Sequence, residues 1–161
     1  MTDSTAKIKN TAKGQSFGYA FDQISKAIEN EFFLEALTLS ESIISDRLLS
    51  YVNGVSNKKY TVHTPFSKLI KDWKALKGEV KWKEIDDLIV AVDEWRKARN
   101  VCIHGATKSQ PGTPTQPVPE FIELSKKTAK QGKILANYIS NWQSSDKRKK
   151  TNKKIISKSE K

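Results

Sequence analysis

Four polar side chains that can do chemistry fall at helical spacing in one short stretch of the chain. Arg96, Arg99, Asn100 and His104 lie on or beside the apolar stripe of that stretch when it is drawn on a helical wheel. A guanidinium that faces the interior needs a carboxylate, a phosphate or water as its partner, because burying an unpaired charge is costly. An imidazole carries a proton near neutral pH. The pattern indicates either an acid–base site that handles phosphate or a set of structural ion pairs.

One acidic residue elsewhere in the chain is also predicted to face inward. Glu41 falls on the apolar stripe of a helix predicted over residues 31–52, where it could pair with Arg96 or Arg99. That pairing fits the structural interpretation, in which His104 simply caps the end of its helix. Periodicity alone favours this interpretation, since buried arginines are usually structural.

The spacing between Arg99 and His104 limits how their two side chains can act on one substrate. The two residues are five positions apart, which is an angle of about 140° on an ideal helix. Their side chains can converge only over the end of the helix or across a subunit boundary. His104 precedes Gly105, where the helix is predicted to end, and the negative end of the helix dipole favours a protonated imidazole there.

Helical periodicity dominates the rest of the chain, and strand signals are scarce. A Pro-rich loop over residues 105–119 interrupts the pattern, and Thr64–Pro65 resembles a helix start. The sequence predicts an all-α fold, an up-and-down bundle of four or five helices. We expect a flexible N-terminus over 1–15, a helical domain over 16–143 and a disordered Lys-rich tail over 144–161. The predicted helices cover about 17–29, 31–52, 64–78, 84–103 and 120–142.

Positive charge is concentrated near the C-terminus. The 161 residues carry a formal net charge of +11, and residues 144–161 hold eight Lys or Arg but only two acids. Such a tail could lie along RNA phosphates, or it could only keep the protein soluble. Trp82, between two lysines, is the best candidate for stacking on an unpaired base, whereas Trp95 and Trp142 fit core positions. The predicted RNA-binding residues are Trp82, Lys147, Arg148, Lys149 and Lys150.

Several functional classes find no support in the sequence. The single Cys102 cannot form an internal disulfide and is predicted to be packed, and His63 is predicted to lie in an exposed loop. No metal-ligand spacing, phosphate-binding glycine loop or nucleophile elbow is present, so we expect no metal and no cofactor. No apolar run is long enough for a membrane span and no export signal is found, so a cytoplasmic protein is expected.

The string RNVCIH, from Arg99 to His104, resembles the R-x(4–6)-H motif of the HEPN superfamily, in the variant with a polar residue after the Arg. The preceding helix, FFLEALTLSESIISDRLLSYV, is also similar to the helix before that motif in many HEPN proteins. The resemblance covers most of residues 17–142. It implies a dimeric helical bundle with a composite active site. Active family members are metal-independent endoribonucleases of toxin–antitoxin, abortive-infection and other defence systems.

The resemblance also implies roles for individual residues. Arg99 would hold the scissile phosphate, His104 would move the proton of the 2′-hydroxyl or the leaving oxygen, and Asn100 would orient the His or bind phosphate. Glu41 would fix Arg99 and Arg96 from below. The expected product is a 2′,3′-cyclic phosphate.

The chain departs from one branch of the family, and an alternative remains open. Toxins silenced by a partner nucleotidyltransferase carry a Tyr two residues after the His, where this chain has Ala106. Control by that route is therefore not expected, although another antitoxin or defence-complex partner is compatible with the motif. The alternative is a non-catalytic helical RNA-binding or regulatory subunit in which Arg99 and His104 are structural.

Overall fold

Five α-helices make up most of the described part of the chain, residues 11–105 and 111–159 of a computed structural model. No strand occurs among these residues, apart from an isolated antiparallel bridge between Trp82 and Ile85. The predicted all-α bundle is therefore confirmed. The helices are α1 Thr11–Glu29, α2 Phe33–Val55, α3 Phe66–Lys77, α4 Leu88–Gly105 and α5 Val118–Ser159.

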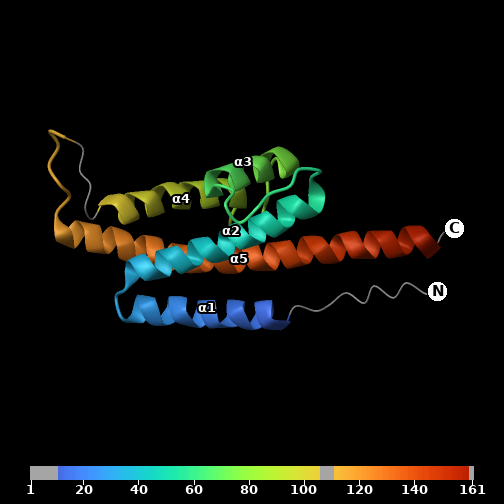
Figure 1. The fold of residues 1–161 in the computed structure, drawn as a ribbon, viewed down its shortest axis with the longest axis horizontal. Coiled ribbons are helices and arrows are strands. Elements are labelled where there is room, and N and C mark those ends of the chain that lie inside the picture. Colours follow the sequence, from blue (N-terminus) through green and yellow to red (C-terminus); the bar gives the residue numbers. More distant parts are fainter. Residues whose placement is uncertain (1–10, 106–110, 160–161) are drawn as a thin grey trace.

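Helix α2 is the centre of the bundle. It contacts all four other helices, most extensively α5, which lies beside it along the long axis of the molecule (Figure 1). Figure 1 also shows α1 on one side of this pair and α3 with α4 on the other. The apolar stripe of α2 is buried as its periodicity predicts. Its buried members include Leu37, Ile44, Leu48, Tyr51 and Val52.

The first and last helices are longer than their apolar patterns predict. Helix α1 begins at Thr11, within the segment expected to be flexible, and residues 1–10 lie outside the described part. Helix α5 continues past the predicted end at Trp142 to Ser159, through a segment expected to be a disordered tail. A polar, Lys-rich sequence has no apolar stripe, but lysine itself has good helix propensity, so the backbone can continue an existing helix.

The start of α4 is later than the periodicity suggests. Residues 84–87 form a turn instead of a helix, and Asp87 accepts hydrogen bonds at Oδ1 from the backbone N–H groups of Ile89 and Val80, at 3.0 and 3.2 Å. The carboxylate caps the helix, because it satisfies an N–H that has no partner in the first turn. The expected cap at Thr64 does not form: its hydroxyl accepts from the N–H of Thr61.

None of the helices in the described residues is long and apolar enough to cross a membrane.

A close approach between α4 and α5 fixes the position of Trp95. The ring is fully buried, and its Nε1 donates a hydrogen bond of 2.9 Å to the backbone oxygen of Thr128. The ring lies over Gly132, where an added Cβ would meet Trp95 Cζ2 at only 2.7 Å. The absence of a side chain at Gly132 therefore lets the indole pack directly on the backbone of α5.

The substitution Gly132→Ala should lower the thermal midpoint of unfolding. Overpacking costs about 1–3 kcal/mol, and each kcal/mol corresponds to about 2–4 °C for a chain of this size. Differential scanning calorimetry measures the shift. Gly54→Ala is the matched control, since a Cβ there meets nothing within 4 Å and should leave the midpoint equal or slightly higher. Equal midpoints for wild type and Gly132→Ala would contradict the close packing.

Candidate functional site

Arg99 is held on two sides by polar partners. Its Nε lies 2.5 Å from Oε2 of Glu41 on α2, and both atoms are enclosed by protein. Its Nη1 donates a hydrogen bond of 2.9 Å to Oδ1 of Asn100, the next residue on α4. The prediction that Glu41 faces inward and meets an arginine of α4 is confirmed, and the arginine is Arg99.

The Glu41–Arg99 pair is mostly shielded from solvent. The side chains are 23% and 19% exposed, so the attraction between the charges is weakened by water much less than in a surface pair. It joins α2 to α4, two helices that make few other contacts with each other. The pair therefore both fixes the position of the Arg99 guanidinium and links the motif helix to the centre of the bundle.

Arg96 has a local partner instead of Glu41. Its Nε and Nη2 both lie 2.9 Å from Oδ1 of Asp93, one helical turn earlier, and Lys97 binds the other carboxylate oxygen at 3.0 Å. Burial alone would raise the pKa of Asp93, but the hydrogen bonds from Lys97 and Arg96 outweigh it and hold the pKa below its usual value. Arg96 is thus part of an ion-pair cluster on one face of α4, separate from Glu41.

His104 lies at the surface, in the last turn of α4, so the prediction that it faces inward is wrong. On the helical wheel His104 lies at the edge of the apolar stripe. A helical wheel gives the direction of a side chain but does not show whether another part of the chain packs over it. Asn100 is partly buried, and Cys102 is buried as expected. His63 lies exposed in the segment before α3, also as expected.

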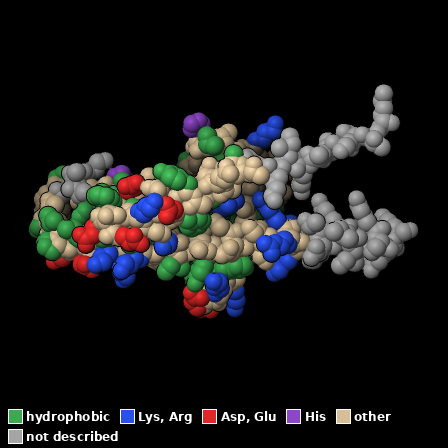
Figure 2. All heavy atoms as spheres, turned by 90° about the horizontal axis from the view of Figure 1, so that it is seen from below, with side chains coloured by type: hydrophobic (Ala, Val, Ile, Leu, Met, Phe, Trp, Pro, Cys, Tyr) green, Lys and Arg blue, Asp and Glu red, His purple; other side chains and the backbone are tan. Residues whose placement is uncertain are grey.

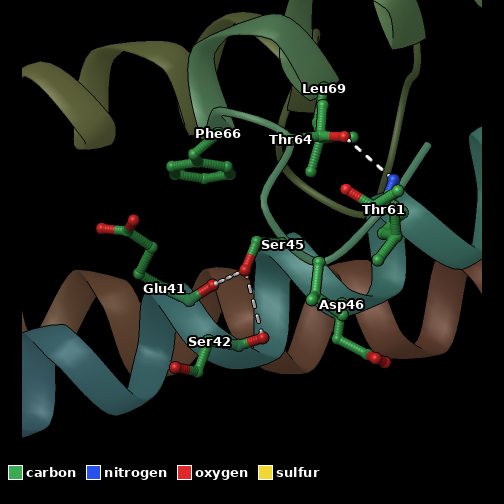
Figure 3. A pocket seen from close by; sticks show the side chains of 10 residues that line it. Glu41, Ser42, Ser45, Asp46, Thr61, Thr64, Phe66 and Leu69 are labelled. Carbon is green, nitrogen blue, oxygen red and sulfur yellow. Dashed lines mark hydrogen bonds between the residues drawn. The ribbon is translucent and has the colours of Figure 1, made fainter.

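A cavity of about 270 Å³ adjoins Glu41. It is formed by α2, the segment before α3 and the start of α3, and Figure 3 shows the Glu41 side chain directed toward Phe66 on one side of it. Its polar lining consists of hydroxyls and carboxylates, among them Ser45 and Asp46. Asp46 is paired with Lys13 at 2.9 Å. Carboxylates and hydroxyls do not attract phosphate, so this cavity is not suited to an anionic ligand.

Trp82 and the lysines of α5 lie in a different part of the molecule. The Trp82 ring is partly buried and packs against the core, so it is less exposed than predicted. Lys147, Arg148, Lys149 and Lys150 are exposed on α5. Figure 2 shows Lys and Arg side chains gathered on α5 next to its undescribed end.

The structure also brings together residues that the sequence analysis did not single out. Asp146 accepts a hydrogen bond from Lys77 of α3 at 2.7 Å and forms an ion pair with Lys150, one turn later, at 2.9 Å. The only signal in the sequence is an acid within a basic run, which does not reveal a partner 69 residues away.

No group of three or more His, Cys, Asp or Glu side chains in the described ranges is arranged to hold a metal ion.

Comparison with family models, with curated proteins and with solved structures finds no match to this chain.

Removing the charge of Glu41 should destabilise the fold. In Glu41→Gln the mostly shielded Arg99 guanidinium loses its ionic partner, and leaving a buried group without its partner costs about 1–3 kcal/mol of the free energy of unfolding. Urea denaturation measures this difference.

Glu94→Gln is the matched control, because Glu94 is exposed on α4 and no ion pair to it occurs among the described residues. Its free energy of unfolding should stay within about 0.5 kcal/mol of wild type. Equal effects of the two substitutions would show that the Glu41–Arg99 pair contributes nothing specific.

Proposed function

We propose that this protein is a HEPN-like, metal-independent endoribonuclease that acts as a homodimer. The observation that carries the proposal is the position of Arg99: its Nε lies against Glu41, its Nη1 donates to Asn100, and 19% of its side chain stays exposed. A guanidinium has five N–H donors in a fixed plane, so the remaining edge can bind the oxygens of a phosphate.

Arg99 is suited to stabilise charge on a phosphate. During cleavage the phosphorus becomes five-coordinate and negative charge develops on its non-bridging oxygens. Donors that are already oriented stabilise this charge without reorganising, and Glu41 supplies that orientation from α2. In this role Glu41 is a positioning residue, because it contacts Arg99 and not the substrate.

His104 is suited to move the proton. A neutral imidazole removes the proton of the 2′-hydroxyl, the 2′-oxygen attacks phosphorus, and the bond from phosphorus to the 5′-oxygen breaks. The leaving oxygen takes a proton from a second, protonated imidazole, and the products are a 2′,3′-cyclic phosphate and a 5′-hydroxyl. His104 of a second copy can supply that imidazole, since the exposed ends of two α4 helices can face each other across a two-fold axis.

The setting that fits such an enzyme is a toxin–antitoxin or antiviral defence system in the cytoplasm, with RNA as substrate and an antitoxin or defence-complex protein as a further partner. This part of the proposal rests on the resemblance of Arg99–His104 and the preceding helix to the HEPN motif.

A second candidate function is favoured by the same ion pair. Glu41 neutralises Arg99, and a partly buried, neutralised arginine also serves a purely structural role. The protein would then be a non-catalytic RNA-binding or regulatory subunit.

Purified wild-type protein should cleave labelled RNA in the presence of EDTA and leave cyclic phosphate ends. His104→Ala should reduce the rate by about 10²–10⁴-fold, the usual contribution of a general acid or base. A denaturing gel with end-group analysis measures both effects.

His63→Ala is the matched control, since it removes the other exposed histidine and should leave the rate unchanged. Thermal midpoints equal to that of wild type would show that both variants are folded. Binding of several RNAs without cleavage of any would reject the nuclease and favour the regulatory subunit.

A further inference from the structure

A cavity of about 530 Å³ lies between the end of α3, the segment that follows it and the middle of α5. The volume falls within the range of about 300–1,000 Å³ that is usual for small-ligand sites. Trp142 lines this cavity. Since an α-helix rises 1.5 Å per residue, Trp142 lies about 36 Å along α5 from Val118, where that helix begins. The Pro-rich connection from α4 leads to that start, so the cavity is remote from His104 (Figure 1). Its lining is Lys77, Lys81, Trp82, Trp142, Ser145, Asp146, Lys149 and Lys150.

The cavity has an ordered cationic wall. Asp146, whose side chain is only 12% exposed, binds Lys77 at 2.7 Å and Lys150 at 2.9 Å. Burial alone would raise the pKa of Asp146, but hydrogen bonds from Lys77 and Lys150 outweigh it and keep the carboxyl ionised at neutral pH. One carboxylate thus fixes two ammonium groups, each of which keeps further N–H donors for a ligand.

The charge of the cavity is not balanced. Its lining contains four lysines and one acid, a net charge of +3. Lys81 and Lys149 have no ionic or hydrogen-bonding partner among the described residues. Ammonium groups that converge on one concave surface repel one another unless an anion lies between them.

Aromatic surface adjoins these lysines. Trp82 is fixed by two backbone hydrogen bonds of 3.0 Å with Ile85, and Trp142 packs against Tyr51 and Trp73 with ring centroids 4.9 and 5.0 Å apart. Trp142 is almost fully buried, whereas Trp82 is only partly buried. Cationic groups with an aromatic face beside them are the usual elements of a site for single-stranded nucleic acid.

We propose that this cavity binds the sugar-phosphate backbone of single-stranded RNA, with phosphate at Lys81 and Lys149 and a base against Trp82. A strand is favoured over a free nucleotide because two further exposed basic residues, Lys147 and Arg148, directly precede the cavity's Lys149 and Lys150 on α5. This inference rests on the proposed function only in taking RNA as the partner. It does not require that the protein cleaves RNA. The cavity is a holding site, apart from the chemistry at Arg99 and His104.

The test is a binding titration of the full chain with a fluorescently labelled, fully 2′-O-methylated single-stranded RNA, followed by anisotropy. This probe cannot be cleaved through 2′-hydroxyl attack, so failure of the nuclease proposal does not affect the measurement. The double variant Lys81→Ala/Lys149→Ala should weaken binding. It should also reduce the slope of log K against log salt concentration by about 1.4, because two phosphate contacts are lost at about 0.7 each.

A matched control separates a site from general charge. Lys59→Ala/Lys130→Ala removes two exposed lysines that lie outside the cavity and have no ion-pair partner within residues 11–105 and 111–159. It should change affinity and salt slope much less than the cavity variant. Equal losses in the two double variants, or no binding by the wild type, would overturn the proposal.

The source of the phosphate is tested by competition. Unlabelled RNA of the same length should displace the probe at a concentration near its own Kd, and a nucleoside monophosphate should not displace it at that concentration. Displacement by the nucleoside monophosphate, abolished in Lys81→Ala/Lys149→Ala, would assign the cavity to a free nucleotide and overturn the strand proposal. Thermal midpoints equal to that of wild type would show that the variants are folded.

Discussion

The burial of one continuous apolar face of α2 is the constraint on which the rest of the structure depends. Helix α2 contacts all four other helices of the described chain, and its contact with α5 is the most extensive. Burial of aliphatic and aromatic side chains supplies most of the stabilisation of a domain of this size. Arg99, His104 and the basic residues of α5 lie on helices that pack on α2 or are its partner α5, whereas Lys81 and Trp82 lie on the segment between α3 and α4. Displacing either helix would therefore move both candidate sites.

Charged groups at the borders of this core are arranged in two different ways. Glu41 and Arg99 form a mostly shielded pair that links α2 to α4, and its net charge is zero. Around Asp146 a single carboxylate meets two lysines, and further lysines are left over. The first arrangement orients a guanidinium, whereas the second concentrates positive potential on a concave surface. These differences explain why one site is proposed for chemistry and the other for binding.

The two sites lie toward different ends of a long bundle, and α5 connects them. Because α5 is one continuous helix from Val118 to Ser159, its length and stiffness fix their separation. An RNA held in the cavity beside Trp82 would thus reach the end of α4 only as an extended strand. In the proposed homodimer, the two exposed α4 ends would meet, and the two cavities would lie on the outer parts of the assembly.

The sequence by itself determined the helical class, the core faces and the inward direction of an acid on α2 and an arginine on α4, since each follows from side chains repeating every 3.6 residues. It missed the start of α4, where Asp87 forms a cap, and the extension of α5, which has no apolar pattern to mark it. Only the tertiary structure decided that Glu41 meets Arg99 and that His104 is exposed. The ion pair between Lys77 and Asp146 likewise follows only from the tertiary structure. The reason is physical: periodicity gives the direction of a side chain, but its partner and burial depend on which distant segment packs there.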